Sequence, residues 1–198
     1  MREVELKAAV PDLAAARAAV ERAGARLAYE GRLEDRRYDV AERALSGRDN
    51  VLRLRIYRRA GVVSAAALDW KGPTDYTGGY KVREELSSGV AAPDELAIIL
   101  EKLGYVVTRE IDREIAQYEL QGATVRFERY PRMDVLVEVE GAPEAIERAI
   151  GAIGLPRAAF TSERLPAFVT RYESRTGERA ALCDRELAGD FRFSAADA

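Results

Sequence analysis

The spacing of apolar residues along the chain predicts four amphipathic helices. In three segments apolar residues recur three or four positions apart, a Pro precedes the first turn and a Gly follows the last one, as is typical of helix boundaries. These segments lie between Pro11 and Gly24, between Pro93 and Gly104, and between Pro143 and Gly154. A fourth helix is predicted over about 165–174.

Between the helices apolar residues alternate with polar ones, which is typical of half-buried β-strands. Strands are expected near residues 2–9, 35–40, 51–59, 63–71, 79–87, 106–118, 123–129 and 134–141. Eight strands in hairpin-like succession favour an α+β fold built on an antiparallel sheet that can close into a barrel. We expect one domain over residues 1–177, followed by a polar tail over residues 178–198.

Charged side chains gather on one face of most of these strands. Because side chains two positions apart share a face, Glu3, Glu5 and Lys7 stand together, opposite Val4 and Leu6. The same parity groups Arg53 with Arg55, Asp69 with Lys71, Lys81 with Arg83 and Glu85, Arg109 with Arg113, and Glu138 with Glu140. An ordinary half-exposed sheet would explain any one strand. The near absence of Ser, Thr, Asn and Gln on these faces favours a curved sheet with a charged inner face.

Composition narrows the chemistry available to such a face. The 198-residue chain has 31 Lys and Arg against 34 Asp and Glu, a net charge of -3, one cysteine and no histidine. Without histidine, Ser-His-Asp triads, Cys-His dyads and histidine-ligated zinc are excluded, which leaves carboxylates, Lys, Arg, Tyr and hard metal ions. The charge balance argues against binding to duplex nucleic acid or to a membrane surface. The single cysteine, Cys183, points to a cytoplasmic protein.

A charged inner face suits a ligand that is itself densely charged. Arg pairs bind phosphate oxygens in a bidentate manner, and paired carboxylates supply the oxygen ligands that Mg²⁺ or Mn²⁺ prefers. Burying so many charges without partners would cost a large free energy. The pattern therefore predicts a polyanion bound together with divalent cations.

Six charged motifs follow one another along the chain. They are Glu3-Val4-Glu5-Leu6-Lys7, Asp35-Arg36-Arg37-Tyr38-Asp39, Leu52-Arg53-Leu54-Arg55, Trp70-Lys71-Gly72-Pro73, Lys81-Val82-Arg83-Glu84-Glu85 and Val137-Glu138-Val139-Glu140. In this order, over roughly residues 2–175, they resemble the CYTH superfamily, the triphosphate tunnel metalloenzymes. That superfamily includes class IV adenylate cyclases, thiamine triphosphatases and inorganic triphosphatases, and the chain is most similar in style to the cyclases.

The resemblance implies an antiparallel eight-stranded β tunnel with helices packed outside and a triphosphate threaded through it. By the same resemblance, the residues that contact phosphate are Lys7, Arg53, Arg55, Lys71, Arg83, Arg109 and Arg113. Glu138 and Glu140 would hold one Mg²⁺ or Mn²⁺ ion, and Glu3, Glu5 and Glu85 would hold or position a second. Lys7 and Glu5 are the candidate catalytic residues.

Three features depart from the family pattern. Asp69 stands where the family often has Thr, two residues before the lysine of the KGP motif. One strand that usually carries a Lys/Arg pair has only arginines here, so either Arg109 or Arg113 takes the place of the family lysine. The acidic residue upstream of the last carboxylate pair is either Glu128 or Asp134.

Three functional classes follow from the resemblance. The first is a phosphorus–oxygen lyase like the class IV adenylate cyclases, which converts ATP into cyclic AMP and pyrophosphate. The second is a phosphohydrolase of tripolyphosphate, nucleoside triphosphate or thiamine triphosphate. The third is a non-catalytic polyphosphate- or nucleotide-binding module, against which the complete carboxylate pairs argue. The expected partner is a small triphosphate such as ATP or tripolyphosphate. The sequence is compatible with a homodimer but does not determine the oligomeric state.

Overall fold

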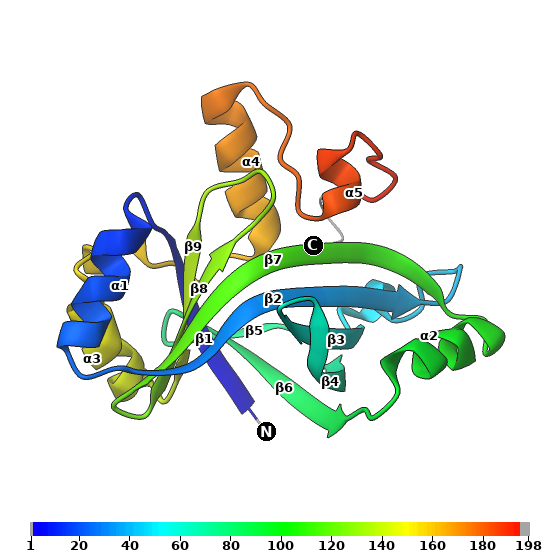
Figure 1. The fold of residues 1–198 in the computed structure, drawn as a ribbon, viewed down its shortest axis with the longest axis horizontal. Coiled ribbons are helices and arrows are strands. Elements are labelled where there is room, and N and C mark those ends of the chain that lie inside the picture. The colour runs from blue at the N-terminus through cyan, green and yellow to red at the C-terminus, as the bar shows by residue number, and fades with distance from the viewer. Residues whose placement is uncertain (1, 195–198) are drawn as a thin grey trace.

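The structure is a computed structural model that describes residues 2–194 (Figure 1). Met1 and the end of the predicted tail, residues 195–198, lie outside the described residues. The strands are β1 (Arg2–Ala9), β2 (Arg26–Asp39), β3 (Val51–Arg59), β4 (Val62–Lys71), β5 (Asp75–Thr77), β6 (Tyr80–Gly89), β7 (Val106–Leu120), β8 (Ala123–Arg129) and β9 (Leu136–Gly141). The α-helices are α1 (Leu13–Arg22), α2 (Pro93–Lys102), α3 (Pro143–Ile153), α4 (Leu165–Thr176) and α5 (Asp184–Leu187).

Eight strands close into an antiparallel barrel. The order around it is β1-β9-β8-β7-β2-β3-β4-β6, and β6 pairs back onto β1. The short strand β5 adds to the outer edge of β6. This arrangement confirms the predicted eight-stranded antiparallel tunnel. Among residues 2–194, no helix is long and apolar enough to cross a membrane.

Strand β2 is longer than predicted, because it begins at Arg26 and not near residue 35. Its pairing with β7 shifts register between Leu27 and Tyr29, which interrupts the alternation of apolar and polar residues. Gly31 follows with φ of +153°, and a Cβ at this position would lie 2.4 Å from the carbonyl oxygen of Arg58. Only glycine allows so close an approach of the neighbouring strand. The extra residues pair with the last residues of β7.

Three helices cover the outer face of the barrel. Helices α1 and α3 lie side by side at one end (Figure 1), where Leu6, Val139 and Ile146 are buried in the largest apolar cluster. Helix α2 covers β3 at the other end. The burial of each such side chain contributes about 1.5–3 kcal/mol to stability. Because these helices occupy the apolar face of the strands beneath them, the opposite face, which carries residues such as Glu5 and Lys7 of β1, points into the barrel.

Helix α4 differs from the other helices because it closes one end of the interior. Its residues Leu165, Phe168 and Val169 pack with Ile111 of β7 and Leu136 of β9. Ile111 lines the interior cavity, and Leu136 is the cross-strand partner of another lining residue. The apolar residues of α4 therefore cover the inner face of the sheet at this end.

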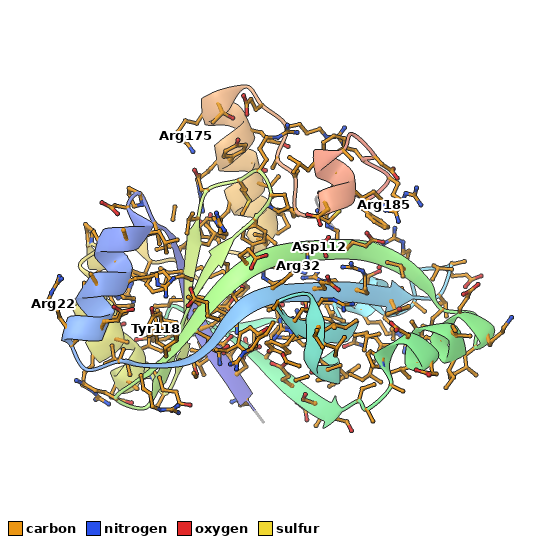
Figure 2. All side chains as sticks on the ribbon, in the orientation of Figure 1. Arg22, Arg32, Asp112, Tyr118, Arg175 and Arg185 are labelled. Carbon is orange, nitrogen blue, oxygen red and sulfur yellow. The ribbon has the colours of Figure 1, made fainter. Side chains whose placement is uncertain are left out.

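Part of the segment after residue 178 packs against the barrel, where Ala180, Leu182 and Glu186 are buried. Strand β7 runs beyond the end of β8, and the chain at Leu182 takes up the exposed edge, with the amide of Asp112 donating to its carbonyl oxygen over 2.7 Å. Figure 2 shows Arg32 and Asp112 beneath α5. Arg32 Nη2 bonds Asp184 Oδ2 at 2.7 Å, at the start of that helix. A covered strand edge cannot pair with another chain.

Candidate active site

The barrel encloses a cavity of about 80 Å³ whose lining is strongly cationic. Ten of its eighteen lining residues are Lys or Arg and four are Asp or Glu. The cations are Lys7, Arg37, Arg53, Arg55, Lys71, Lys81, Arg83, Arg113, Arg126 and Arg164, and the acids are Glu5, Asp35, Glu128 and Glu138. This excess of positive charge makes the interior an attractive site for a polyanion.

The wall formed by β1, β6 and β9 combines carboxylates with lysines. Lys7 Nζ lies 2.7 Å from Glu5 Oε1 and also pairs with Glu138, while Lys81 pairs with Glu5. Burial acts to raise the pKa of Glu5, but the charges of Lys7 and Lys81 hold this pKa well below its usual value. Glu5 is therefore ionised at neutral pH.

Three carboxylates of this wall lie close enough together to hold a metal ion. Glu3, Glu5 and Glu140 each offer an oxygen, and these oxygens lie within 4.8 Å of one another. Glu5 and Glu140 are direct cross-strand partners between β1 and β9, and like charges in that position destabilise a sheet. Burial raises the pKa of Glu140, Arg126 opposes this, and the charges of Glu3 and Glu5 raise it further. A divalent cation would relieve this repulsion, so the cluster fits Mg²⁺ or Mn²⁺.

The other two predicted metal ligands, Glu85 and Glu138, do not belong to this cluster, and like its members they pair with cations. Glu85 Oε2 lies 3.0 Å from Lys71 Nζ, and Glu85 Oε1 lies 3.4 Å from Arg53 Nη2. Glu138 pairs with both Lys7 and Arg126. The role of Glu85 and Glu138 as metal ligands stays a prediction.

The opposite wall, formed by β2, β3, β7 and β8, carries arginines around two buried acids. Asp35 accepts hydrogen bonds from Arg55 at 2.9 and 3.2 Å and from Arg113 Nη2 at 3.0 Å. Glu128 accepts hydrogen bonds from Arg113 Nε at 2.9 Å and from Arg126 Nε at 3.1 Å. Burial acts to raise the pKa of both carboxyls, but the guanidinium groups hold each pKa far below its usual value. These acids fix the arginines in place.

The cations that line the cavity outnumber the acids that line it. Burial and the charge of Arg53 lower the pKa of Arg37 to about 9. Burial lowers the pKa of Lys81 to about 8, although the charge of Glu5 opposes this shift. Within the described residues, Nη1 of the buried Arg113 has no hydrogen-bond partner. A phosphate oxygen would supply the negative charge and the acceptor that these groups need.

Six of the seven predicted phosphate-binding residues line the cavity. They are Lys7, Arg53, Arg55, Lys71, Arg83 and Arg113. The seventh, Arg109, is not among the lining residues, because its Nη1 and Nη2 lie 2.6 and 3.0 Å from the two carboxylate oxygens of Glu186 in α5. Of the two arginines that were candidates for the place of the family lysine, the structure brings only Arg113 to the cavity.

Several residues of the cavity were not assigned from the sequence. Arg126 was not named, and Glu128 was named only as an alternative to Asp134, which is not among the lining residues. Both alternate with Val125 and Phe127 along β8, so the strand parity that identified the other charged pairs also applies to them. Asp35 and Arg37 lay in a recognised motif without an assigned role. Arg164 precedes α4 and belongs to no strand, so no periodicity in the sequence points to it.

Fold and site together define a class of protein, a closed antiparallel barrel whose interior carries an arginine wall and a carboxylate cluster. A family model described as the CYTH domain matches residues 1–150. The chain therefore belongs to the CYTH family, which confirms the resemblance seen in the sequence.

Solved structures with the same fold come from bacteria, archaea and a plant. A protein from Vibrio parahaemolyticus named a "putative adenylate cyclase" superposes with a TM-score of 0.72 at 18% identity, over 85% of this chain and 97% of that one. The PH1819 protein of Pyrococcus horikoshii gives a TM-score of 0.67 at 23% identity, over 82% and 94% of the two chains.

The plant structure is HpAC1 from Hippeastrum, described as a "putative adenylyl cyclase" with a dominant triphosphatase activity. It superposes with a TM-score of 0.59 at 16% identity, over 91% of this chain and 98% of that one. Identities this low establish a shared fold. The sequence matches none of the curated proteins.

Proposed function

We propose that this protein is a Mg²⁺- or Mn²⁺-dependent enzyme that cleaves a phosphorus–oxygen bond of a triphosphate, converting ATP into cyclic AMP and pyrophosphate like the class IV adenylate cyclases. The observation that carries the proposal is a cavity in which ten Lys and Arg face four acids, beside a cluster of three carboxylates. Capture of an anion needs only the cations. The carboxylate cluster therefore favours catalysis over a binding module.

The arginine wall supports the proposal because it is pre-organised. Asp35 and Glu128 hold Arg55 and Arg113 in position before any ligand arrives, while Nη1 of Arg113 is left to donate to a phosphate oxygen. Phosphoryl transfer depends mostly on positioning and on electrostatic stabilisation of the charge that develops on the phosphate oxygens. Donors already in place need no reorganisation during the reaction.

The carboxylate wall supplies the metal ligands and the candidate catalytic lysine. Glu3, Glu5 and Glu140 would hold the divalent cation, which supplies positive charge to the phosphate oxygens when bound. Lys7, fixed between Glu5 and Glu138, presents its ammonium group to the cavity, where it can donate to a phosphate oxygen or orient the attacking hydroxyl.

Hydrolysis of a triphosphate is the alternative, and two observations favour it. The tunnel cavity is small, at about 80 Å³, and almost wholly charged, which suits a triphosphate without an organic group. HpAC1, which shares the fold, is described as having a dominant triphosphatase activity. The same walls serve both reactions, because cyclisation needs a ribose hydroxyl to attack the α-phosphorus and hydrolysis needs a water to attack the terminal one.

The test is a product analysis with two substrates. The protein is incubated with ATP and Mn²⁺ and, separately, with tripolyphosphate and Mn²⁺, and the products are resolved by ion-exchange chromatography. Cyclic AMP with pyrophosphate would support the cyclase, whereas ADP with phosphate would support the alternative. Either activity should disappear with EDTA. No turnover of either substrate would contradict both.

A further inference from the structure

Helix α2 exposes apolar side chains on the side that faces away from the barrel. Ile98 and Ile99 are 56% and 52% exposed, and Leu103 and Val106, which follow in the chain, are 68% and 48% exposed. Single exposed apolar residues are common, whereas a group of neighbours is typical of an interaction surface. We call these four residues the α2 patch. It lies at the end of the barrel away from α1 and α3 (Figure 1).

The α2 patch is separate from the face that joins α2 to the barrel. On that face Leu100 is buried against β3, and Leu96 packs beside it. The five consecutive residues Leu96–Leu100 are all apolar, and at 3.6 residues per turn they surround the helix. In α3, by contrast, the outward positions carry Glu147 and Arg148. A helix that is apolar on all sides is typical of one covered on all sides, so α2 has the composition of a helix with a second partner.

Two charged residues flank the isoleucines of α2 at equal distances. Glu95 lies three residues before Ile98, and Lys102 lies three residues after Ile99. Both charged side chains are exposed, and neither has an ion-pair partner within residues 2–194. Because each residue turns the helix by about 100°, these four side chains leave it within about 100° of one another. They therefore share one outward face.

This face is complementary to a second copy of itself. Two α2 helices can pack antiparallel about a two-fold axis that passes between Ile98 and Ile99. Glu95 of each copy then lies level with Lys102 of the other, and the isoleucines meet at the centre. A two-fold axis repeats every contact, so the interface contains two such ion pairs. A parallel arrangement would instead place Glu95 opposite Glu95, which is unfavourable.

We infer that two copies of this chain associate through α2, with the helices antiparallel and Ile98 and Ile99 at the centre of the interface. The inference is independent of the proposed function, because none of the residues of this face lines the tunnel cavity. A helix of ten residues is about 15 Å long. The area that it buries is small, so the dimer should dissociate reversibly.

The first test measures association of the unmodified protein by sedimentation velocity from about 2 to 200 µM, where a monomer–dimer equilibrium is expected. Ile98→Glu places a charge at the centre of the interface and should weaken association by at least about 10-fold. Leu27→Glu, which changes an exposed apolar residue in the first part of β2, is the matched control and should leave association unchanged. A monomer at every concentration would overturn the inference and leave the α2 patch to solvent or to another protein. A dimer that is insensitive to Ile98→Glu would also overturn it.

The second test distinguishes the antiparallel pairing from any other interface. Glu95→Lys and Lys102→Glu each replace both ion pairs with like charges, and each should weaken association by about 5- to 30-fold. An equimolar mixture of the two variants restores both pairs in the mixed dimer, so it should associate about as tightly as the unmodified protein. The double variant Glu95→Lys/Lys102→Glu should do the same, and it keeps the net charge of the chain, which separates local pairing from overall charge.

The exchange of charges has clear contrary outcomes. These substitutions fall on exposed positions, so the variants should fold, as far-UV circular dichroism would show. If either single variant associates as tightly as the unmodified protein, Glu95 and Lys102 do not meet across the interface. If the mixture and the double variant associate as weakly as the single variants, the antiparallel pairing is wrong. Either result would overturn the inference.

Discussion

Arg109 and Arg113 lie on the same face of β7 and are buried to a similar degree, yet their surroundings differ. Both terminal nitrogens of Arg109 bind the carboxylate of Glu186, in the covering segment that ends with α5. Arg113 is shared between Asp35 and Glu128, lines the cavity and keeps one nitrogen without a partner within the described chain. The first arrangement attaches the C-terminal segment to the barrel, whereas the second leaves a donor for a ligand. Burial and charge alone do not distinguish a structural arginine from a binding one.

The largest effect on stability is expected from Glu186→Ala. The substitution leaves the guanidinium of Arg109 buried without its partner and also removes the acceptor of the Leu182 amide, 2.7 Å away. Loss of one member of a buried pair costs about 3–5 kcal/mol, which urea denaturation would measure. The matched control is Arg171→Ala, because the exposed Arg171–Glu163 pair contributes only about 0–1 kcal/mol. Equal effects of the two variants would contradict the structural role of Glu186.

The largest effect on activity is expected from Arg113→Ala. This change removes a pre-organised donor from the tunnel and should lower kcat/KM for the triphosphate by about 100- to 1,000-fold. Arg113→Lys keeps the charge but loses the planar pair of donors, so an intermediate loss is expected. Per folded molecule, Glu186→Ala should retain most of its activity. If Glu186→Ala loses as much activity as Arg113→Ala, the comparison between the two arginines is wrong.

Ligand binding should produce a smaller, measurable stabilisation. Tripolyphosphate with Mg²⁺ at 100 times its Kd should add about 2.7 kcal/mol and raise Tm by about 5–10 °C. The shift should be retained in Glu186→Gln and much reduced in Arg113→Ala, as differential scanning fluorimetry would show. The absence of a shift in the unmodified protein would argue against a tunnel for triphosphates.

The contribution of the two buried acids Asp35 and Glu128 to stability should be constant near neutrality and should change in acid. Because neighbouring arginines lower the pKa of Asp35 and Glu128 in the folded state, their contribution is complete above the unfolded values of about 4. It is lost progressively as the pH falls below these values, since the unfolded chain then binds more protons. Urea denaturation at pH 7, 5, 4 and 3 would measure this loss, and equal stability at pH 7 and 3 would refute it.

Much of the fold could be predicted from the sequence, because alternation and helix boundaries are local signals. The four main helices and seven of the strands lie close to the predicted ranges. The first part of β2 was not predicted, because a register shift and Gly31 interrupt its alternation. The packing of residues 180–187 has no local signal in the sequence, because it depends on the edge of β7 beyond β8, which exists only in the folded barrel.

The sequence was sufficient to predict which side chains face the interior of the barrel, but not which contacts they make there. Parity places a side chain inside or outside the barrel, which is why six predicted cations line the cavity. Parity does not tell how far along the tunnel a side chain lies or what covers it, so Arg109 and Arg113 were equivalent in the sequence. Arg164 comes from a segment without strand periodicity, and only tertiary packing brings it to the cavity.

The three clustered carboxylates lie across the seam of the barrel. Glu3 and Glu5 belong to its first strand, and Glu140 belongs to its last. The cluster cannot form until β9 has been synthesised. Bringing β9 to β1 closes a loop of most of the chain, and contacts so distant in sequence form slowly. A divalent cation that binds only the completed cluster would favour the closed barrel by mass action. Mg²⁺ added during refolding should therefore increase the yield of closed barrels, which makes cation affinity a measure of correct assembly.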